Sequence, residues 1–202
     1  MAGEARLEGE VGEKALSMLK EITSVLEKFG VDYVLDCGTL LGIMRENRLL
    51  PWDNDVDLAV DSSQLTKLKR CMFLLWFKGY RVRFAKSTIE TASIPYGAKR
   101  IFRIRNRKGI FHRGDNLIDI FIKYDAGDGF HYVRIGEGVN SVEQRFPTNF
   151  LREKSTVDFE GKQYPIPKNY DEYLTYRYGD WRIPVKEWDY ISQDKSKVDS
   201  SS

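Results

Sequence analysis

The sequence is poor in the residues that build disulfide frameworks and zinc sites. It has two cysteines, Cys37 and Cys71, among 202 residues, which excludes a disulfide scaffold and a cysteine-based zinc site. Its two histidines, His112 and His131, have no partners at ligand spacing. We therefore expect both cysteines to be buried thiols, and we assign the histidines no functional role.

The sequence also lacks a long hydrophobic run and an excess of charge of one sign. No apolar stretch approaches the roughly 20 residues of a membrane span, and the N-terminal segment has no apolar signal region. Its 32 Lys and Arg against 30 Asp and Glu give a net charge of +2, a balance that is not typical of nucleic-acid binders. The exception is the basic segment 99–113, with Lys99, Arg100, Arg103, Arg105, Arg107, Lys108 and Arg113.

Length and hydrophobic periodicity predict one α+β domain whose second half is rich in strands. The 202 residues, 42% of them hydrophobic, suffice for one well-buried domain. Helical spacing predicts helices at about 11–29, 39–46, 65–79 and 169–178, with Trp76 on the apolar spacing of the third. Strands are predicted at about 31–36, 55–60, 80–84, 99–105, 117–123, 130–135 and 155–166, with turns at 106–109 and 160–161. We expect a domain over 1–190 and a disordered tail over 191–202, which is polar and serine-rich.

The most informative segment joins a Gly-Thr turn, Gly38 and Thr39, to three aspartates at alternating positions, Asp53, Asp55 and Asp57. A strand places residues two apart on one face, so Asp55 and Asp57 point together while the apolar residues between them point into a core. Neighbouring carboxylates repel each other unless a cation lies between them, and Mg²⁺ and Mn²⁺ prefer such oxygen ligands. The sequence therefore predicts a magnesium or manganese site, with a solvated strand end as the alternative.

A third acid, Asp119, lies in the apolar run from Leu117 to Ile122, with no other charge before Lys123. A buried carboxylate needs a partner. Asp119 either completes the metal site or accepts a proton from an attacking hydroxyl as a general base. The alternative is an ion pair with one of the arginines.

These motifs resemble the LicD family, which includes the fukutin-type proteins and has the nucleotidyltransferase fold. The resemblance is concentrated between Gly38 and Asp57, in Gly-Thr-Leu-Leu-Gly, in Arg45 and in Pro-Trp-Asp-x-Asp-x-Asp. The Asp-Ile-Phe element at Asp119 and the closing segment 165–180 extend it over roughly residues 30–185. It implies a mixed β-sheet flanked by helices.

The resemblance implies that Asp55, Asp57 and Asp119 are the catalytic and metal-binding residues. Glycine before a helix start lets backbone N–H groups approach a phosphate. The substrate-binding candidates are Gly38, Thr39, Arg45, Trp52, Asp53, Arg103 and Arg105.

Each candidate outside the acidic pair also has a structural alternative. Arg45 has either a structural or phosphate-binding role, which the resemblance favours, or is a surface arginine. Trp52 either stacks on a base or sugar or packs against its own loop. Arg103 and Arg105 share one face of a candidate strand, which suits a diphosphate but equally an exposed basic strand face. Asp53 precedes the regular strand and either caps or orients the loop.

The resemblance implies a metal-dependent phosphotransferase. It would move a phospho-alcohol, of the phosphocholine or ribitol phosphate type, from a CDP-activated donor to a sugar hydroxyl of a glycan and release CMP. One alternative is a true nucleotidyltransferase that moves a nucleoside monophosphate from a triphosphate and releases pyrophosphate. Another is a non-catalytic module that binds nucleic acid through the basic segment 99–113. As given, the chain is expected in the cytoplasm, like bacterial relatives, or in the Golgi lumen if an anchor precedes it.

Overall fold

The computed structural model describes residues 6–108, 112–136, 141–185 and 193–198. Its helices are α1 (Gly9–Lys28), α2 (Cys37–Glu46), α3 (Leu65–Phe77), α4 (Asn149–Arg152) and α5 (Tyr170–Tyr178), with a 3₁₀ turn at Ser62–Gln64. Its strands are β1 (Tyr33–Leu35), β2 (Val56–Asp61), β3 (Arg81–Lys86), β4 (Lys99–Lys108), β5 (His112–Asp125), β6 (Phe130–Ile135), β7 (Val142–Pro147), β8 (Lys154–Phe159) and β9 (Lys162–Pro167). The expected α+β architecture is confirmed.

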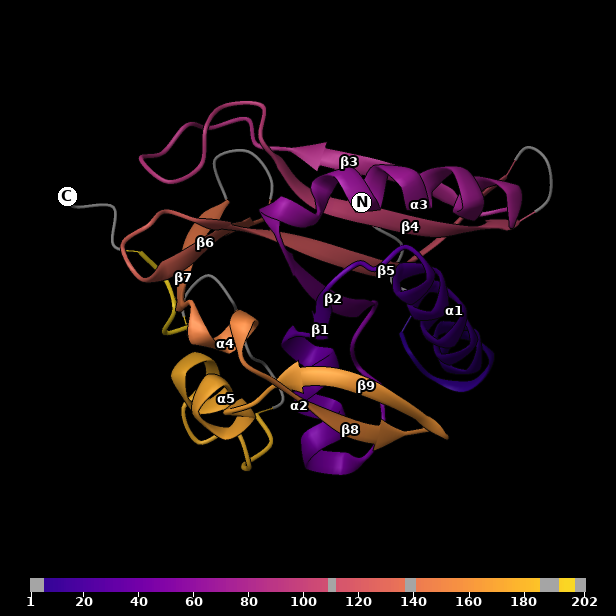
Figure 1. The fold of residues 1–202 in the computed structure, drawn as a ribbon. Helices are drawn as coiled ribbons and strands as arrows, with labels where there is room; N and C mark the ends of the chain where they lie inside the picture. Colours follow the sequence, from indigo (N-terminus) through magenta and orange to yellow (C-terminus); the bar gives the residue numbers. More distant parts are fainter. Residues whose placement is uncertain (1–5, 109–111, 137–140, 186–192, 199–202) are drawn as a thin grey trace.

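The central sheet has seven strands and is mixed. Its main order is β1-β2-β5-β4-β3, and β6 and β7 continue from the end of β5. β2 pairs with β5 in parallel, whereas the other pairs are antiparallel. The hairpin β8–β9 forms a separate two-stranded sheet. In Figure 1, α3 lies along β3 and β4 with α1 beside it, while α2, α5 and the hairpin lie together at the opposite side of the molecule.

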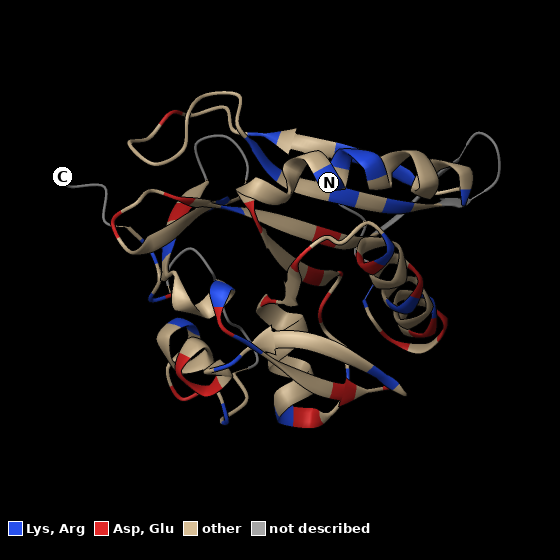
Figure 2. Ribbon diagram, in the orientation of Figure 1, with Lys and Arg blue, Asp and Glu red and all other residues tan. Residues whose placement is uncertain are grey.

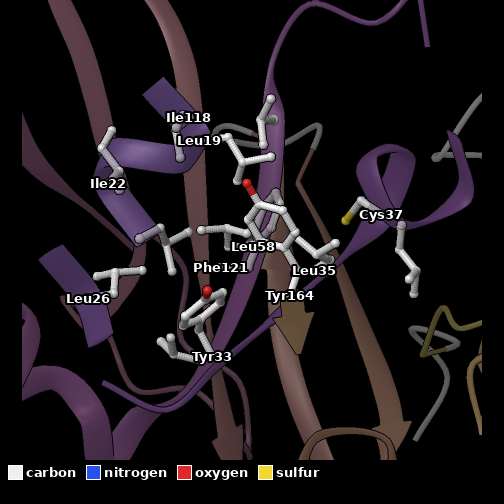
Figure 3. Close-up of a cluster of buried hydrophobic side chains, with 14 of the residues drawn as sticks. Leu19, Ile22, Leu26, Tyr33, Leu35, Cys37, Leu58, Ile118, Phe121 and Tyr164 are labelled. Atoms are coloured by element: carbon white, nitrogen blue, oxygen red, sulfur yellow. The ribbon is translucent and has the colours of Figure 1, made fainter. Parts of the chain in front are cut away.

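The main core lies between α1 and the sheet. Leu19, Ile22 and Leu26 recur at spacings of three and four on α1 and are fully buried, as a core-facing helical stripe should be. They gather with Leu58 of β2 and Tyr164 of β9 (Figure 3). The apolar residues between the aspartates therefore point into the core, as the alternation predicts.

Several boundaries differ from the predictions. The acidic strand begins at Val56, so Asp55 lies just before it. α2 begins at Cys37, because Asp36 caps it by accepting a hydrogen bond from the Cys37 N–H at 2.9 Å. Gly38 and Thr39 thus lie in the first turn of a helix and not in a turn before it. Both cysteines are buried free thiols, as expected.

Other parts of the chain correct the sequence analysis more strongly. β7 and α4 were not predicted, and β4 continues through the expected turn at 106–108; Gly109 lies outside the described residues. Within the tail expected to be disordered, residues 193–198 pair with β7 through Arg145 N–H to Ser196 O at 2.9 Å and Val198 N–H to Glu143 O at 3.0 Å. Trp76, predicted on the buried spacing of α3, is exposed. No helix in the described part of the chain is long and apolar enough to cross a membrane.

Gly42 sets how closely α2 approaches the segment that follows it. A Cβ at this position would lie 2.6 Å from the Arg48 carbonyl oxygen and 2.9 Å from Leu50 Cγ. In an open helix, replacing glycine by alanine stabilises the protein by roughly 0.5–1 kcal/mol. A destabilising effect at position 42 would therefore indicate this close approach.

We predict that Gly42→Ala destabilises the protein by about 1–3 kcal/mol through overpacking, measured by urea unfolding. Ser17→Ala at an exposed α1 position should change stability by less than about 0.5 kcal/mol, and a stabilised Gly42→Ala would contradict this packing.

Candidate active site

A cavity of about 580 Å³ opens where the start of α2 meets the loop before β2. Four acids line it: Asp53 and Asp55 from the loop, Asp57 from β2 and Asp119 from β5. The cavity is also lined by Gly38, Arg45, Trp52, Arg103 and Arg177. Eight of the ten residues expected from the sequence to bind metal or substrate line this cavity, and Thr39 and Arg105 do not.

Strand pairing places the acids and one arginine in a row across the sheet. Asp57 is the neighbour of Asp119 in the parallel β2–β5 pair, and Asp119 is the neighbour of Arg103 in the antiparallel β5–β4 pair. Cross-strand neighbours lie on one face and interact. Arg103 Nε donates to Asp119 Oδ2 at 3.1 Å, and the Asp119 side chain is almost completely buried. The ion pair that the sequence left open for Asp119 is therefore present.

The Gly-Thr pair couples α2 to the acidic strand. The Asp57 N–H donates to the Thr39 hydroxyl at 2.8 Å, and the Asp36 N–H donates to the Asp57 carbonyl at 3.1 Å. A Cβ on Gly38 would collide with Asp53 Oδ2, so glycine makes room for that carboxylate beside the helix. Thr39 is buried and does not line the cavity. Its hydroxyl holds β2 against α2, and its assignment as a substrate contact stays a prediction.

The three clustered aspartates have raised pKa values. Burial is the main cause for each, and it raises the pKa of Asp53 to about 6. The pKa of Asp55 is raised by burial and then by the charges of Asp119 and Asp53, and that of Asp57 by burial and then by Asp55 and Asp53. A cluster of carboxylates with raised pKa values is stabilised when protons neutralise it or when a cation compensates its negative charge.

The acids do not converge into a complete metal cage. Within the described ranges, no group of three or more His, Cys, Asp or Glu side chains is placed to hold a metal ion. The ligand set of Asp55, Asp57 and Asp119 expected from the sequence stays a prediction, and in this structure Asp119 is paired with Arg103. Asp55 and Asp57 remain as two oxygen donors that repel each other in one cavity.

Arg45 and Trp52 line the same cavity but contact each other and protein groups. Arg45 donates through Nε and Nη2 to Glu46 Oε1 at 3.0 and 2.7 Å, and through Nη1 to the Trp181 carbonyl at 3.4 Å. Its guanidinium carbon lies 5.9 Å from the centroid of the Trp52 ring, and Trp52 is 46% exposed. The Arg45 side chain is nearly buried, unlike a surface arginine, and its phosphate-binding role stays a prediction, while Trp52 presents a ring to the cavity.

Arg105 does not line the cavity. The pairing of β4 with β5 shifts register between Ile104 and Arg105, whereas the pairing of β4 with β3 is regular from Arg103 to Arg105. The two arginines therefore keep the alternation expected of one strand face, but Arg105 lies one step further along β4. The predicted pair of arginines on the cavity wall is thus reduced to Arg103.

Sequence reasoning missed a buried ionic network behind the cavity. Asp36 is fully buried and forms ion pairs with Lys123 at 2.9 Å and Arg177 at 3.8 Å, and it accepts a hydrogen bond from the Tyr173 hydroxyl. Burial alone would raise the pKa of Asp36, but the charges of Lys123 and Arg177 outweigh it and lower the pKa to about 2. Arg177 also pairs with Asp194 at 2.8 Å. These residues tie the start of α2 to β5, α5 and the segment 193–198.

One signal for this network was present in the sequence. Lys123 is the first charge after Asp119 in an apolar strand, and a buried lysine needs a carboxylate. Its partner, Asp36, lies 87 positions earlier by residue number, and no local pattern relates the two. The candidates from the sequence therefore include Gly38 on the cavity side of α2 but omit Asp36, which caps the helix.

Comparison with known proteins gives a family. Residues 30–169 match the family model described as LicD/FKTN/FKRP, nucleotidyltransferase domain. Ribitol-5-phosphate transferase FKTN of Macaca fascicularis is 25% identical over 184 residues, 88% of this chain and 35% of that protein. Lipopolysaccharide cholinephosphotransferase LicD of Haemophilus influenzae is 27% identical over 117 residues, 55% of this chain and 42% of that protein.

The solved structure of the lincosamide antibiotic adenylyltransferase LnuA with lincomycin bound is 16% identical, with a TM-score of 0.46 over 78% of this chain and 83% of that one; this likeness is too distant to bear on function. The chain spans about a third of the length of the fukutin relative. The family match covers most of the chain and contains Gly38, the acidic segment and Asp119. The chain therefore belongs to the LicD/FKTN/FKRP nucleotidyltransferase domain family.

Proposed function

We propose that this protein is a divalent-cation-dependent phosphotransferase that moves a phospho-alcohol from a CDP-activated donor to a sugar hydroxyl of a glycan. The observation that carries the proposal is the row of Asp57, Asp119 and Arg103 on the wall of one cavity, inside the segment that matches the family. Relatives named as a ribitol-5-phosphate transferase and a cholinephosphotransferase support this class of reaction.

Asp55 and Asp57 fit a hard divalent cation. Burial and then neighbouring carboxylates raise their pKa values. The charged form of each side chain is therefore unfavourable until a countercharge is added. Mg²⁺ is often bound through one or two carboxylates, with water and substrate phosphates completing its shell, so the proposal needs no third protein ligand. When bound there, Mg²⁺ or Mn²⁺ would neutralise charge on the donor diphosphate.

Asp119 and Arg103 are proposed to act on the acceptor and the donor, respectively. The guanidinium holds the Asp119 carboxylate in a fixed orientation, from which it would accept the proton of the attacking hydroxyl. Arg103 places a positive charge at the cavity wall, where it would stabilise phosphate oxygens. Trp52 supplies an exposed ring at the same cavity for a base or sugar.

The basic segment 99–113 gives little support to a nucleic-acid-binding module. Arg100 is buried and donates to the carbonyls of Lys86 and Arg134 at 3.4 Å each, and Arg103 is directed to Asp119. The side chains of residues 107–113 lie outside the described part of the structure. A continuous exposed phosphate-binding stripe is therefore not formed by the described half of this segment.

We predict that Asp57→Asn abolishes cation-dependent turnover yet stabilises the cation-free protein. The folded-state pKa of Asp57 is raised, so its ionisation costs folding free energy, and stability falls as pH rises from the ordinary value of about 4 through the raised pKa. Asparagine removes that loss, so the gain should appear near neutral pH and vanish towards pH 4. Unfolding with a chelator and with added magnesium measures both effects. Asp158→Asn, exposed in β8, is the control, and near-normal magnesium-dependent activity of Asp57→Asn would contradict the assignment.

We predict that Asp119→Asn lowers turnover about 10²–10⁴-fold, the usual cost of losing a general base. Because the substitution also breaks a buried ion pair, the double variant Asp119→Asn/Arg103→Gln separates the two roles. It should regain stability relative to Asp119→Asn, since no uncompensated guanidinium remains, and it should stay inactive. An Asp119→Asn protein that is strongly destabilised but fully active in its folded fraction would establish a purely structural ion pair.

Product analysis tests which group is transferred. With CDP-choline or CDP-ribitol, a sugar acceptor and magnesium, we expect CMP and a sugar that carries the phospho-alcohol through a phosphodiester. The alternative, a nucleotidyltransferase, would release pyrophosphate from a nucleoside triphosphate and attach the nucleotide to the acceptor. Pyrophosphate release without CMP formation from either CDP-alcohol would refute the proposed reaction.

A further inference from the structure

The outward face of α3 carries large aromatic side chains where a surface helix normally has polar ones. Five residues lie on its solvent side at successive spacings of one, three, three and one, and we call them the α3 outer face: Lys69, Arg70, Phe73, Trp76 and Phe77. Phe73, Trp76 and Phe77 are 67%, 54% and 65% exposed. None of the five lines the active-site cavity.

The aromatic residues form one contiguous apolar cluster. The rings of Phe73 and Phe77 meet edge to face with centroids 4.7 Å apart, and Trp76 lies 5.3 Å from Phe77. The inner side of α3 is already anchored, because Leu68, Cys71 and Leu75 are fully buried. The outer rings therefore add nothing to the attachment of α3 to its own core, and exposed clusters of this kind mark interaction sites.

Positive charge surrounds this cluster. α3, β3 and β4 contain no Asp or Glu, and Figure 2 shows Lys and Arg concentrated along these three elements. Lys69 and Lys86 of β3 both lie near Lys99 of β4. The pKa of Lys99 is lowered by burial and then by the charges of these two neighbours. Glu21 of α1 is an acid at the C-terminal end of α3, next to the aromatic residues, where Lys78 neutralises it at 2.7 Å. The chain as a whole is nearly neutral at +2, so the charge is segregated to this side.

We propose that the α3 outer face binds the surface of an anionic lipid bilayer. Phe73, Trp76 and Phe77 would enter the headgroup region, where aromatic rings are favoured, while Lys69 and Arg70 contact lipid phosphates. With 13 residues, α3 is far shorter than the roughly 20 needed to span the bilayer, which suits a helix lying in the interface.

Two other occupants fit the observations less well. In a symmetric dimer built on this face, Lys69 and Arg70 would meet like charges of the second copy, because such interfaces are self-complementary. Single-stranded nucleic acid stacks successive bases on separate ring faces, whereas Phe73 and Phe77 are packed against each other. A lipid surface accommodates both the joined rings and the cations beside them.

Vesicle sedimentation tests the proposal without reference to catalysis. The full chain should sediment with phosphatidylcholine–phosphatidylglycerol vesicles and not with phosphatidylcholine alone. Phe73→Ser/Phe77→Ser and Lys69→Glu/Arg70→Glu should each weaken binding by about tenfold or more, since each basic residue near an anionic surface contributes about fivefold. The matched controls are Ile183→Ser, at a 61% exposed position, and Lys14→Glu/Lys28→Glu on exposed α1 positions, which should bind like the original protein.

Tryptophan fluorescence provides a readout that does not depend on these variants folding. Anionic vesicles should shift the emission of the original protein to the blue, and the conservative variant Trp76→Phe should lose that shift while still sedimenting. Equal binding by all variants and controls, or equal binding to neutral vesicles, would overturn the proposal. So would outer-face variants that lose self-association or oligonucleotide binding with vesicle binding unchanged.

Discussion

The parallel pairing of β2 with β5 is the constraint on which the candidate site depends. It sets Asp57 beside Asp119, and the antiparallel neighbour β4 then brings Arg103 to the same row. One apolar set of side chains, including Leu58, holds the strands against α1 on the other face (Figure 3). A shift of one residue in this register would turn the carboxylates towards the core, so burial of the apolar face indirectly fixes the chemistry.

A second constraint acts at the start of α2, where charge is buried and fully compensated. Asp36 caps the helix and is neutralised by Lys123 and Arg177. Asp55 and Asp57 line the cavity, and burial, followed by the charges of neighbouring carboxylates, raises their pKa values. The contrast is one of compensation: Asp36 has its countercharges within the chain, whereas Asp55 and Asp57 are the acids that we propose take theirs from a ligand.

Local sequence pattern was sufficient for much of the fold and for the identity of the acids. Leu19, Ile22 and Leu26 lie on the core side of α1 because helical spacing requires it. The period of two in β2 correctly separates Asp57 from the apolar residues on either side. The motifs that resemble the family, from Gly38 to Asp119, are likewise a property of the sequence, and the family match contains both residues.

The sequence by itself therefore determined most of the elements, the family and the identity of the acids, since these depend on local patterns and motifs. The tertiary structure alone decided their partners. Arg103 lines the cavity and pairs with Asp119 across the sheet, whereas Arg105 does not line it, and Asp36 is neutralised by residues from distant elements. Trp76 has the spacing of a core residue but is exposed, because α3 turns only one side to the sheet and nothing in a hydrophobic pattern says which side a neighbouring element will cover.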